Sequence, residues 1–586
     1  MILNYCLAIA SGLMLVFAYP GWDDSFLVWL WLLPLLYALF QGRTQAHPLR
    51  RGFTLGYLAG LAFFIPNLFW VRHSSRVISG AYDNHWMGWN VELMGWGVVV
   101  GLAAYCSIFW GLWGMLAATV GKPNILGRTS SLLAAPSTRV SLDPKDRVPV
   151  AKALFSASFE SLRTGFMCAS AWVGLEWVRG TLFTGFGWNG LGVPLAHDPS
   201  LIQSADLVGV TGLAFLPVFC TCIGYNTVLR FIEEVRTSRV RPHFDFFIAA
   251  ILVLADVGYG LQVLLTPEPK DSIPLRVLLV QQNIPQVDVW QRSNPEGVKE
   301  GYYDLTAACW NHPIHADLVV WPESALPQTV FEPQTLEFLD RTLMLGDFSL
   351  LSGVDIYEPL KPFYTGAALM RGRVDNYQLY RKIHLVPFGE YLPFRDVGIV
   401  KNLLGKVIPG DFTPGEDTNP LTLEKPQGVQ IIPLICFEDT VGDLARRFVR
   451  ASPQLIVNMT NDGWFLHSEE NEVHLANALF RCIELRRPMA RAANTGVSCF
   501  VDIHGHVGKG DRLEDKKSGK GVFTKGTLPK ELHLDPHPPM TLYALHGDLF
   551  SQVMLVLAAL GWGSYGYIKR KGREREASAA SEALNS

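Results

Sequence analysis

The chain has 586 residues, a length that allows two or three domains. Hydrophobic residues make up 49% of it and charged residues only 18%, so it is more apolar than an average soluble protein. The formal net charge is -3 and no basic stripe is interleaved with aromatic residues, which gives no support for a nucleic-acid partner.

Long apolar runs dominate the first part of the chain. A helix needs about 20 apolar residues to cross the hydrocarbon core of a bilayer. The first run has no basic residue before it, so we expect a membrane helix there and not a cleaved signal peptide. Eight membrane helices are expected, at about 1–19, 25–41, 53–71, 92–120, 165–184, 208–229, 246–266 and 547–568.

The charges of the connecting loops predict how these helices are oriented. Lys and Arg of membrane proteins are retained on the cytoplasmic side. If the N-terminus is inside, the short outer loops hold only Arg72 and Arg76, and both termini lie in the cytoplasm. The inner loops and tail then carry Arg43, Arg50, Arg51, Lys122, Arg128, Arg139, Lys145, Arg147, Lys152, Arg163, Arg236, Arg239, Arg241, Lys569, Arg570, Lys571, Arg573 and Arg575.

A change of pattern near residue 270 divides the chain. The loop at 122–164 is rich in Ser and Pro, so we expect a poorly ordered cytoplasmic insertion there, and the tail REREASAASEALNS has the same character. The expected parts are a transmembrane domain over 1–270, a catalytic domain over 271–540, placed outside the cytoplasm, and a C-terminal helix with a basic tail over 541–586.

One membrane segment carries a pair of opposite charges. Glu176 and Arg179 lie three residues apart on one helical face, toward the outer leaflet. Charges inside a membrane are costly and often functional. We therefore hypothesise that this pair belongs to the substrate site and that Arg179 holds a lipid phosphate. The alternative is a pair that only fixes helix packing or lies at the membrane interface.

Short strands replace the long apolar runs after residue 275. Helical patterns at 333–345 and 472–486 separate some of them, which is typical of an α/β layered domain with buried strands. The expected strands cover 275–281, 317–321, 349–354, 366–370, 377–385, 429–435, 455–459 and 496–503.

Three of these strands lead to a chemically active residue. Glu323 lies two residues beyond one strand, Lys382 lies in a second, and Cys436 directly follows a third. The ends of strands are where α/β domains place active sites. A carboxylate can accept the proton of a thiol, and an ammonium group can stabilise both the thiolate and the oxyanion of an acyl-transfer intermediate. Each residue alone is more typical of packing or of a surface, but the combination predicts acyl transfer through a thioester.

Four segments, in this order, resemble the carbon–nitrogen hydrolase (nitrilase) superfamily: WPESALP, YRKIHLVPFGEYLPF, LICFED and NMTNDGWF. That superfamily has an αββα sandwich and a Glu-Lys-Cys triad. Because helices precede and follow the domain, the resemblance narrows to the bacterial apolipoprotein N-acyltransferases, and it covers nearly the whole chain except 122–164 and the tail. It implies a transmembrane bundle of eight helices joined to a nitrilase-like α/β domain.

The resemblance also implies a role for each matching residue. Glu323 would be the general base, Lys382 the oxyanion-stabilising residue and Cys436 the nucleophile. Glu390, in the segment PFGEYLP, would orient the lysine. No cofactor or metal is implied.

Three more positions are implied to support or contact the substrate. Glu438 falls on a position thought important in the family. Trp290 matches an aromatic residue that lines the lipid-binding region, although an ordinary surface or core tryptophan is the alternative. Many members have Tyr after the nucleophile, whereas this chain has Phe437, which leaves the triad intact but lacks the hydroxyl.

The implied reaction has two stages. Cys436 attacks an acyl ester of a phospholipid, usually phosphatidylethanolamine at its sn-1 position. The thioester then acylates the α-amino group of the diacylglyceryl-cysteine at the start of an apolipoprotein, which completes lipoprotein maturation. We expect a monomeric multi-pass enzyme of the bacterial inner membrane with a periplasmic catalytic domain.

Several features bear on how the thioester would be protected. The apolar stretch 391–408 is expected to be a mobile arm that excludes water, although an ordinary surface helix is the alternative. There is no C-x-x-C pair among the nine cysteines, and we expect Cys436 to stay unpaired. Two other functions remain open: a membrane-tethered nitrilase-type amidase, in which water would be the second nucleophile, and an inactive transporter or scaffold, against which the complete triad argues.

Overall fold

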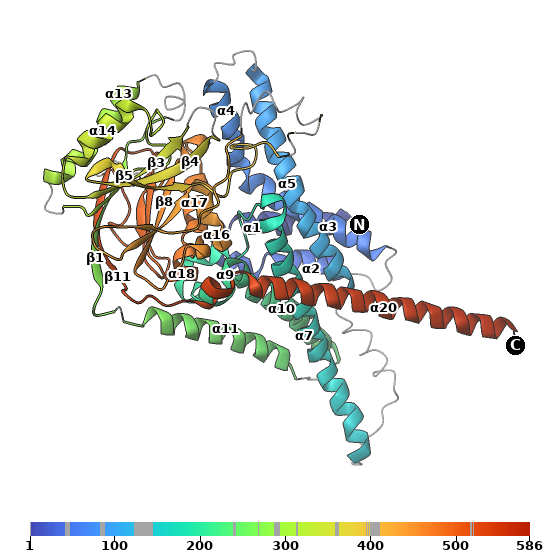
Figure 1. Cartoon of the computed structure of the whole chain (residues 1–586). Helices are drawn as coiled ribbons and strands as arrows, with labels where there is room; N and C mark the ends of the chain where they lie inside the picture. The colour runs from blue at the N-terminus through green and yellow to red at the C-terminus, as the bar shows by residue number, and fades with distance from the viewer. Residues whose placement is uncertain are drawn as a thin grey trace.

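The chain folds into a helical bundle and an α/β domain that lies against one end of it (Figure 1). The computed structural model describes residues 2–585 apart from 41–46, 82–87, 122–143, 238–241, 268, 286–293, 312–314, 358–361, 394, 396–397, 399–410, 516–518 and 520.

Apolar helices make up the bundle. Among the described residues, four helices are long and apolar enough to cross a membrane, or five if one pair bent by 52° counts as a single span. The expectation of several membrane helices is thus confirmed. The expected count of eight is not reached among the described residues, because two of the expected helices are shorter and α7 does not meet the same criterion of length and hydropathy. The bundle contains α1 (Ile2–Val16), α2 (Leu32–Phe40), α3 (Pro48–Asn67), α4 (Arg72–Ala81), α5 (Gly88–Thr119), α7 (Pro144–Thr181), α8 (Pro199–Ile202), α9 (Ala205–Leu213), α10 (Phe215–Thr237), α11 (Phe244–Leu264) and α20 (Leu549–Asn585).

Small residues allow α3 and α5 to approach closely. Gly52, Gly56 and Gly60 follow one face of α3 at intervals of four residues. A Cβ atom on Gly56 would lie 2.2 Å from the carbonyl oxygen of Trp110 on α5. Small residues at this spacing are a common packing device of membrane helices, since the helices gain dispersion contacts when their backbones approach.

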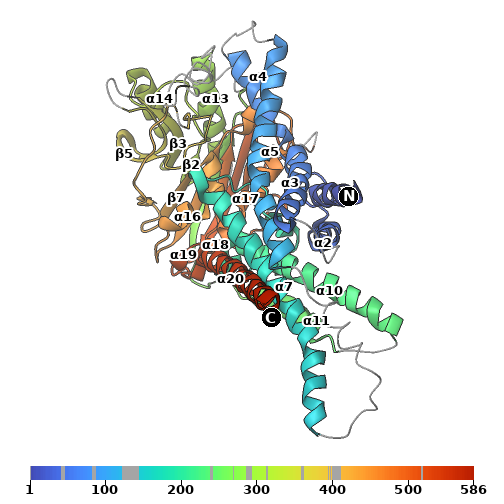
Figure 2. The ribbon, with the colours of Figure 1, turned by 90° about the vertical axis from the view of Figure 1, so that its right-hand side faces the viewer.

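Two segments expected to be poorly ordered are helical. The part of the insertion from residue 144 belongs to α7, while 122–143 lies outside the described residues. The tail continues α20 to Asn585, so its expected disorder is wrong. Both extend helices that are already nucleated, and the tail consists largely of strong helix formers such as Ala, Glu and Arg. Figure 1 shows α20 reaching beyond the body of the bundle, and Figure 2 shows the same for α7.

Two sheets form the centre of the α/β domain. The first has six strands in the order β11-β1-β2-β3-β4-β5, and the second has five in the order β10-β9-β8-β7-β6. The strands are β1 (Ile273–Gln281), β2 (Leu318–Val320), β3 (Ser349–Ile356), β4 (Tyr364–Arg371), β5 (Arg373–Arg381), β6 (Leu421–Thr422), β7 (Gln430–Ile435), β8 (Gln454–Thr460), β9 (Met489–Ala493), β10 (Cys499–Val501) and β11 (Gly526–Leu534).

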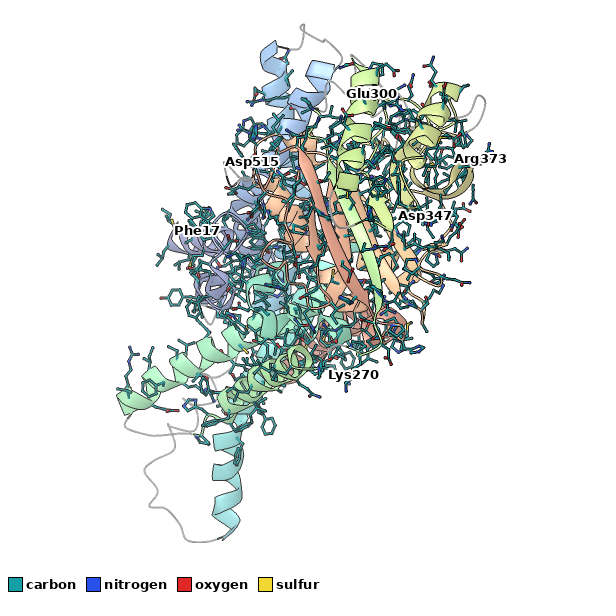
Figure 3. All side chains as sticks on the ribbon, turned by 90° about the vertical axis from the view of Figure 1, so that its left-hand side faces the viewer. Phe17, Lys270, Glu300, Asp347, Arg373 and Asp515 are labelled. Atoms are coloured by element: carbon teal, nitrogen blue, oxygen red, sulfur yellow. The ribbon has the colours of Figure 1, made fainter. Side chains whose placement is uncertain are left out.

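Helices cover the outer faces of both sheets. On the first sheet, α13 (Pro295–Ala308) and α14 (Pro333–Leu343) close an apolar layer, and charged residues such as Glu300, Asp347 and Arg373 lie on this side, away from Phe17 of the bundle (Figure 3). The expected αββα sandwich is therefore confirmed. On the second sheet lie α16 (Gly442–Arg447), α17 (Glu470–Ala478) and α18 (Phe480–Leu485), followed later by α19 (Leu542–His546).

Buried polar contacts join the two parts. Arg486, just after α18, donates to Asp206 Oδ2 and to Gln203 Oε1 at 2.7 Å each. Glu484 Oε1 accepts a hydrogen bond from the backbone nitrogen of Val210 at 2.9 Å. The α8–α9 region of the bundle is thus fixed to the helical layer beside the second sheet.

Candidate active site

The sheet architecture brings three expected site residues together. Lys382 directly follows β5, Cys436 directly follows β7, and Glu323 lies three residues beyond β2. The Nζ atom of Lys382 lies 3.3 Å from Glu323 Oε1 and 2.6 Å from Glu390 Oε1. The other carboxylate oxygen of Glu390 accepts from the backbone nitrogen of Val386 at 2.7 Å, which fixes its orientation. Lys382 is thus held between two carboxylates.

Burial and charge set the protonation of this group. Burial disfavours the charged form of Lys382, yet the carboxylates of Glu390 and Glu323 together outweigh burial and raise its pKa well above the ordinary value. Burial raises the pKa of Glu323 to about 7, against the opposing charge of Lys382. Burial and then the Glu323 carboxylate raise the pKa of the Cys436 thiol, while Lys382 lowers it. The site therefore favours a neutral thiol beside a base that titrates near neutral pH.

Cys436 sits on a sharp, strained turn. Its φ of +51° lies in the left-handed region, which is rare for residues other than glycine and is typical of strained functional positions. The residue begins a short 3-10 turn, Cys436–Thr440. The side-chain amide of Asn458 on β8 donates to the Cys436 carbonyl at 3.3 Å. The neighbouring strand thus helps to hold the turn in this conformation.

Glu438 ties the two loops of the site together. It is fully buried, and its Oε1 accepts from the backbone nitrogens of Ile383 and His384 at 2.7 and 2.9 Å. Its Oε2 accepts from the backbone nitrogen of Ile435 at 2.8 Å, and the Tyr380 hydroxyl reaches both oxygens. Since both of its oxygens are engaged within the protein, Glu438 links the Lys382 loop to the Cys436 loop, and its expected contact with the substrate stays a prediction.

Phe437 and Trp290 are two further residues that were expected near the substrate. The ring of Phe437 is buried, stacks on Trp188 with centroids 6.3 Å apart and lies 5.6 Å from His384, so it fills the boundary between bundle and domain. Trp290 lies outside the described residues.

Most of the expected arm 391–408 also lies outside the described residues. At its start, the Tyr391 hydroxyl lies 2.9 Å from the Thr184 hydroxyl, in the loop after α7.

The charged pair in α7 anchors a loop. Arg179 is 2% exposed and donates to the carbonyl oxygens of Phe186 and Trp188 at 2.8 and 2.7 Å. Glu176 lies 3.5 Å from the guanidinium and accepts from the Leu191 backbone nitrogen at 2.8 Å. The Nη1 group of Arg179 is thus used by the loop after α7, which favours the packing role that we considered as the alternative. The expected phosphate contact of Arg179 stays a prediction.

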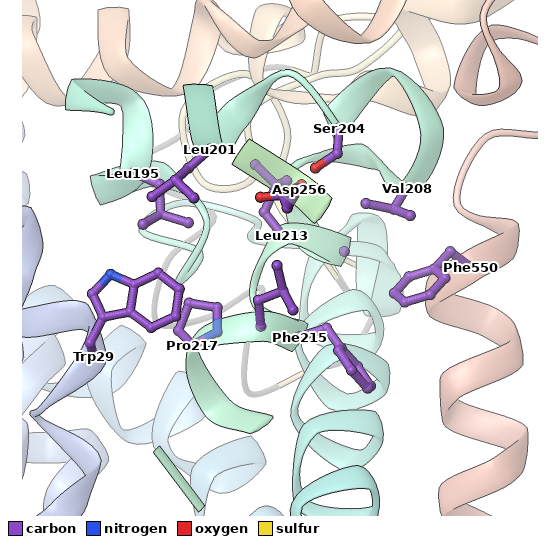
Figure 4. A pocket seen from close by; sticks show the side chains of 12 residues that line it. Trp29, Leu195, Leu201, Ser204, Val208, Leu213, Phe215, Pro217, Asp256 and Phe550 are labelled. Atoms are coloured by element: carbon purple, nitrogen blue, oxygen red, sulfur yellow. The ribbon is translucent and has the colours of Figure 1, made fainter. Parts of the chain in front are cut away.

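A cavity of about 160 Å³ lies inside the bundle, apart from the triad. Figure 4 shows mainly apolar side chains around it, among them Leu213, Phe215 and Phe550, with Ser204 and Asp256 as its polar members. None of the residues expected to act in catalysis lines it.

Sequence comparisons agree with this architecture. A family model described as the apolipoprotein N-acyltransferase N-terminal domain matches residues 11–223, and one described as carbon-nitrogen hydrolase matches residues 279–515. An apolipoprotein N-acyltransferase of Geobacter metallireducens is 30% identical over 564 residues, which cover 95% of this chain and 94% of the relative. A relative of the same name from Sinorhizobium fredii is 30% identical over 573 residues, which cover 94% of this chain and 94% of the relative.

Two solved structures each match less than half of this chain. An amidase from a Nesterenkonia species is 18% identical and covers 44% of this chain and 90% of its own, with a TM-score of 0.33. A carbon-nitrogen hydrolase from Helicobacter pylori is 14% identical and covers 44% of this chain and 89% of its own, also with a TM-score of 0.33.

Proposed function

The chain belongs to the apolipoprotein N-acyltransferase family, and we propose that Glu323, Lys382 and Cys436 carry out its acyl transfer. It is an acyltransferase that acts in lipoprotein maturation. The names of its relatives support this function over the amidase and scaffold alternatives. The observation that carries the proposed site is the contact of Lys382 with both Glu323 and Glu390, at the strand ends that also present Cys436.

The first stage forms a thioester. Glu323 takes the thiol proton of Cys436 as the sulfur attacks the ester carbonyl of a phospholipid, for which we propose the sn-1 ester of phosphatidylethanolamine. Lys382, kept charged by the two glutamates, stabilises the oxyanion. The tetrahedral intermediate collapses with loss of the alkoxide, which receives the proton from Glu323 and leaves as lysophospholipid.

The second stage transfers the acyl group to nitrogen. The α-amino group of the diacylglyceryl-cysteine at the start of the apolipoprotein attacks the thioester, and Glu323 accepts its proton. The intermediate releases the sulfur of Cys436, which regains a proton from Glu323. The products are an N-acylated lipoprotein and free enzyme, with no cofactor or metal required.

The membrane arrangement is part of the proposal. We propose a monomer of the bacterial inner membrane with eight passes, both termini in the cytoplasm and the catalytic domain in the periplasm. The transmembrane domain would cover 1–270, the catalytic domain 271–540 and the last helix with its tail 541–586. The loop charges support this orientation, and a site held over the outer leaflet would raise the effective concentration of two membrane-anchored substrates.

Mass spectrometry of the full-length enzyme after incubation with phosphatidylethanolamine tests the proposal. We expect an acyl adduct on Cys436 that disappears when an apolipoprotein acceptor is added, with the chain recovered on the acceptor amine. The Cys436→Ala enzyme is the control and should form no adduct. An adduct that is lost to water equally fast without an acceptor would support an amidase, and transfer by Cys436→Ala enzyme would refute the proposed nucleophile.

A further inference from the structure

Ionisable side chains are buried directly behind the nucleophile turn. His474 on α17 lies 3.0 Å from Asp439 Oδ1 through Nε2 and 3.1 Å from Asp462 Oδ1 through Nδ1. Glu470, one helical turn earlier, lies 3.4 Å from the same Nδ1 atom. Asp439 belongs to the Cys436–Thr440 turn, so this cluster is attached to the nucleophile by the backbone.

Arg491 on β9 links the cluster to Cys436 by a second route. Its Nη1 atom donates to Asp439 and, at 2.6 Å, to Asn458 Oδ1, and its Nη2 atom lies 3.5 Å from Asp462 Oδ2. Asn458 uses its amide group to bond the carbonyl of Cys436. Arg491 thereby holds the turn at Asp439 and, through Asn458, at the nucleophile itself.

The geometry requires a charged His474. A neutral imidazole donates from one nitrogen only, whereas here each nitrogen faces a carboxylate oxygen. An imidazolium and a guanidinium then balance the carboxylates of Asp439 and Asp462. Burial raises the pKa of Glu470 to about 7, so this third acid adds little charge below neutral pH. The balance matters because an unpaired charge in the interior is costly.

A glycine makes room for the cluster. A Cβ atom at Gly496 would lie 1.9 Å from Asp462 Oδ2. Asp462 also accepts from the Thr460 hydroxyl at 2.9 Å. The close backbone approach and the additional donor indicate a built arrangement of Asp462 and not a chance contact of surface charges.

We propose that His474 and Arg491 form a buried ionic clamp that holds the Cys436 turn in its left-handed conformation and places a fixed positive charge behind the nucleophile. Both are positioning residues that act through Asp439 and Asn458. The inference rests on the proposed role of Cys436, and it names the device by which the chain keeps that strained turn in place.

A metal ion is the competing occupant of the same cluster. One atom each of Asp462, Glu470 and His474 lies within 4.8 Å of the others, which fits a divalent cation. However, Nδ1 of His474 already contacts Asp462, Nε2 contacts Asp439, and the Arg491 guanidinium faces two of the acids. Two protein cations thus already supply the positive charge that a metal would bring.

Kinetics of Cys436 acylation test the clamp in the full-length enzyme in detergent. The variants are His474→Gln, which keeps an amide donor but removes the charge, and Arg491→Lys, which cannot bridge Asp439 and Asn458 in the same way. We expect each to lower the maximal acylation rate by about tenfold or more, while the phospholipid concentration for half-maximal rate stays unchanged. Arg487→Lys is the matched control, because Arg487 is equally buried but bonds backbone carbonyls away from the turn.

Alkylation of the thiol gives a readout that simple loss of stability would not produce. Burial raises the pKa of the Cys436 thiol, as do the carboxylates of Glu323 and Asp462, whereas Lys382 and His474 lower it. His474→Gln should therefore slow iodoacetamide alkylation of Cys436 about tenfold at a fixed pH, while that of exposed Cys6 is unchanged.

Three outcomes would overturn the clamp. They are wild-type acylation and alkylation rates in both variants, an equal loss in Arg487→Lys, and a stoichiometric metal in purified enzyme whose removal by a chelator reproduces the defect. If His474→Gln does not fold, Arg491→Lys decides alone. Failure of the proposed function is distinguishable, since it would appear as activity in the Cys436→Ala enzyme.

Discussion

The proposed role of Glu323 as a base depends on surroundings that hold its pKa near neutrality. Burial raises that pKa to about 7, and only the carboxylate form can accept the proton of Cys436. We expect the acylation rate to rise with pH up to about 7 and to fall about tenfold for each unit below it. Adduct formation on Cys436, followed by mass spectrometry over a pH series, measures this profile.

The control for that profile is the Glu323→Gln enzyme. It lacks the base, so its acylation rate should be lower by about 10²–10⁴ and should not show the same dependence near pH 7. A profile identical to that of the unaltered enzyme would mean that another group titrates.

Glu438 offers a second test at the scale of single residues. Glu438→Gln replaces one acceptor oxygen by an NH₂ group that faces backbone donors, and a hydrogen bond to a charged group contributes about 1.5–3 kcal/mol. We expect a loss of at least that size in unfolding free energy, together with loss of acylation. Tyr380→Phe removes one donor and should cost about 1 kcal/mol. Chemical denaturation of both enzymes compares them, and equal losses would contradict the central role of the carboxylate.

Residue roles can be predicted from sequence where chemistry and position agree. Glu323, Lys382 and Cys436 can be recognised because a base, a cation and a thiol each lie at or near a strand end. The contacts of Arg179 cannot, because they depend on a loop that folds back to offer two carbonyl oxygens. The role of His474 in the clamp cannot be predicted from sequence either, because a single histidine in a helix does not indicate which acidic residues will face it.

At the scale of elements, apolar strands are the predictable ones. The runs that became β1, β3, β7 and β8 are continuous and β-rich, as buried strands are. β11 was not expected, because its sequence, GTLPKELHL, contains a proline and charged residues. The strand tolerates them because it lies at an edge of the sheet. The tail of α20 was predicted wrongly for a different reason. Its polar composition predicted disorder, but the tail continues a helix that begins in the apolar segment before it.

The packing of α3 on α5 makes a prediction for an element pair. Gly56→Ala would place a methyl group 2.2 Å from the Trp110 carbonyl oxygen, so one helix must shift. We expect a loss of about 1–3 kcal/mol, the usual cost of overpacking, seen as a lower unfolding temperature in detergent. Gly101→Ala on α5 is the matched control, because its Cβ atom meets nothing within 4 Å and alanine favours a helix. Equal effects of the two changes would show that helix propensity alone is measured.

At the scale of the whole molecule, the α/β domain is an insertion between two helices of the bundle. β1 follows α11, and β11 leads to α19 and α20. β1 and β11 are antiparallel neighbours, with Ile273 opposite Leu534, so the chain enters and leaves the domain at the same end. If α11 and α20 both cross the membrane, their ends next to the domain must therefore lie on one side of it.

This insertion gives the membrane orientation a sharp test. Lys270 is exposed at the entry to the domain, whereas residue 578 lies beyond the basic segment of α20. In a background with Cys6→Ser, we expect Lys270→Cys to react with a membrane-impermeant maleimide added to cells whose outer membrane alone has been opened. Ser578→Cys should react only after the inner membrane is also permeabilised, since the positive residues before it favour the cytoplasm. Labelling of both positions from the same side would require a different number of crossings in the last helix, and labelling in the reverse order would place the catalytic domain in the cytoplasm.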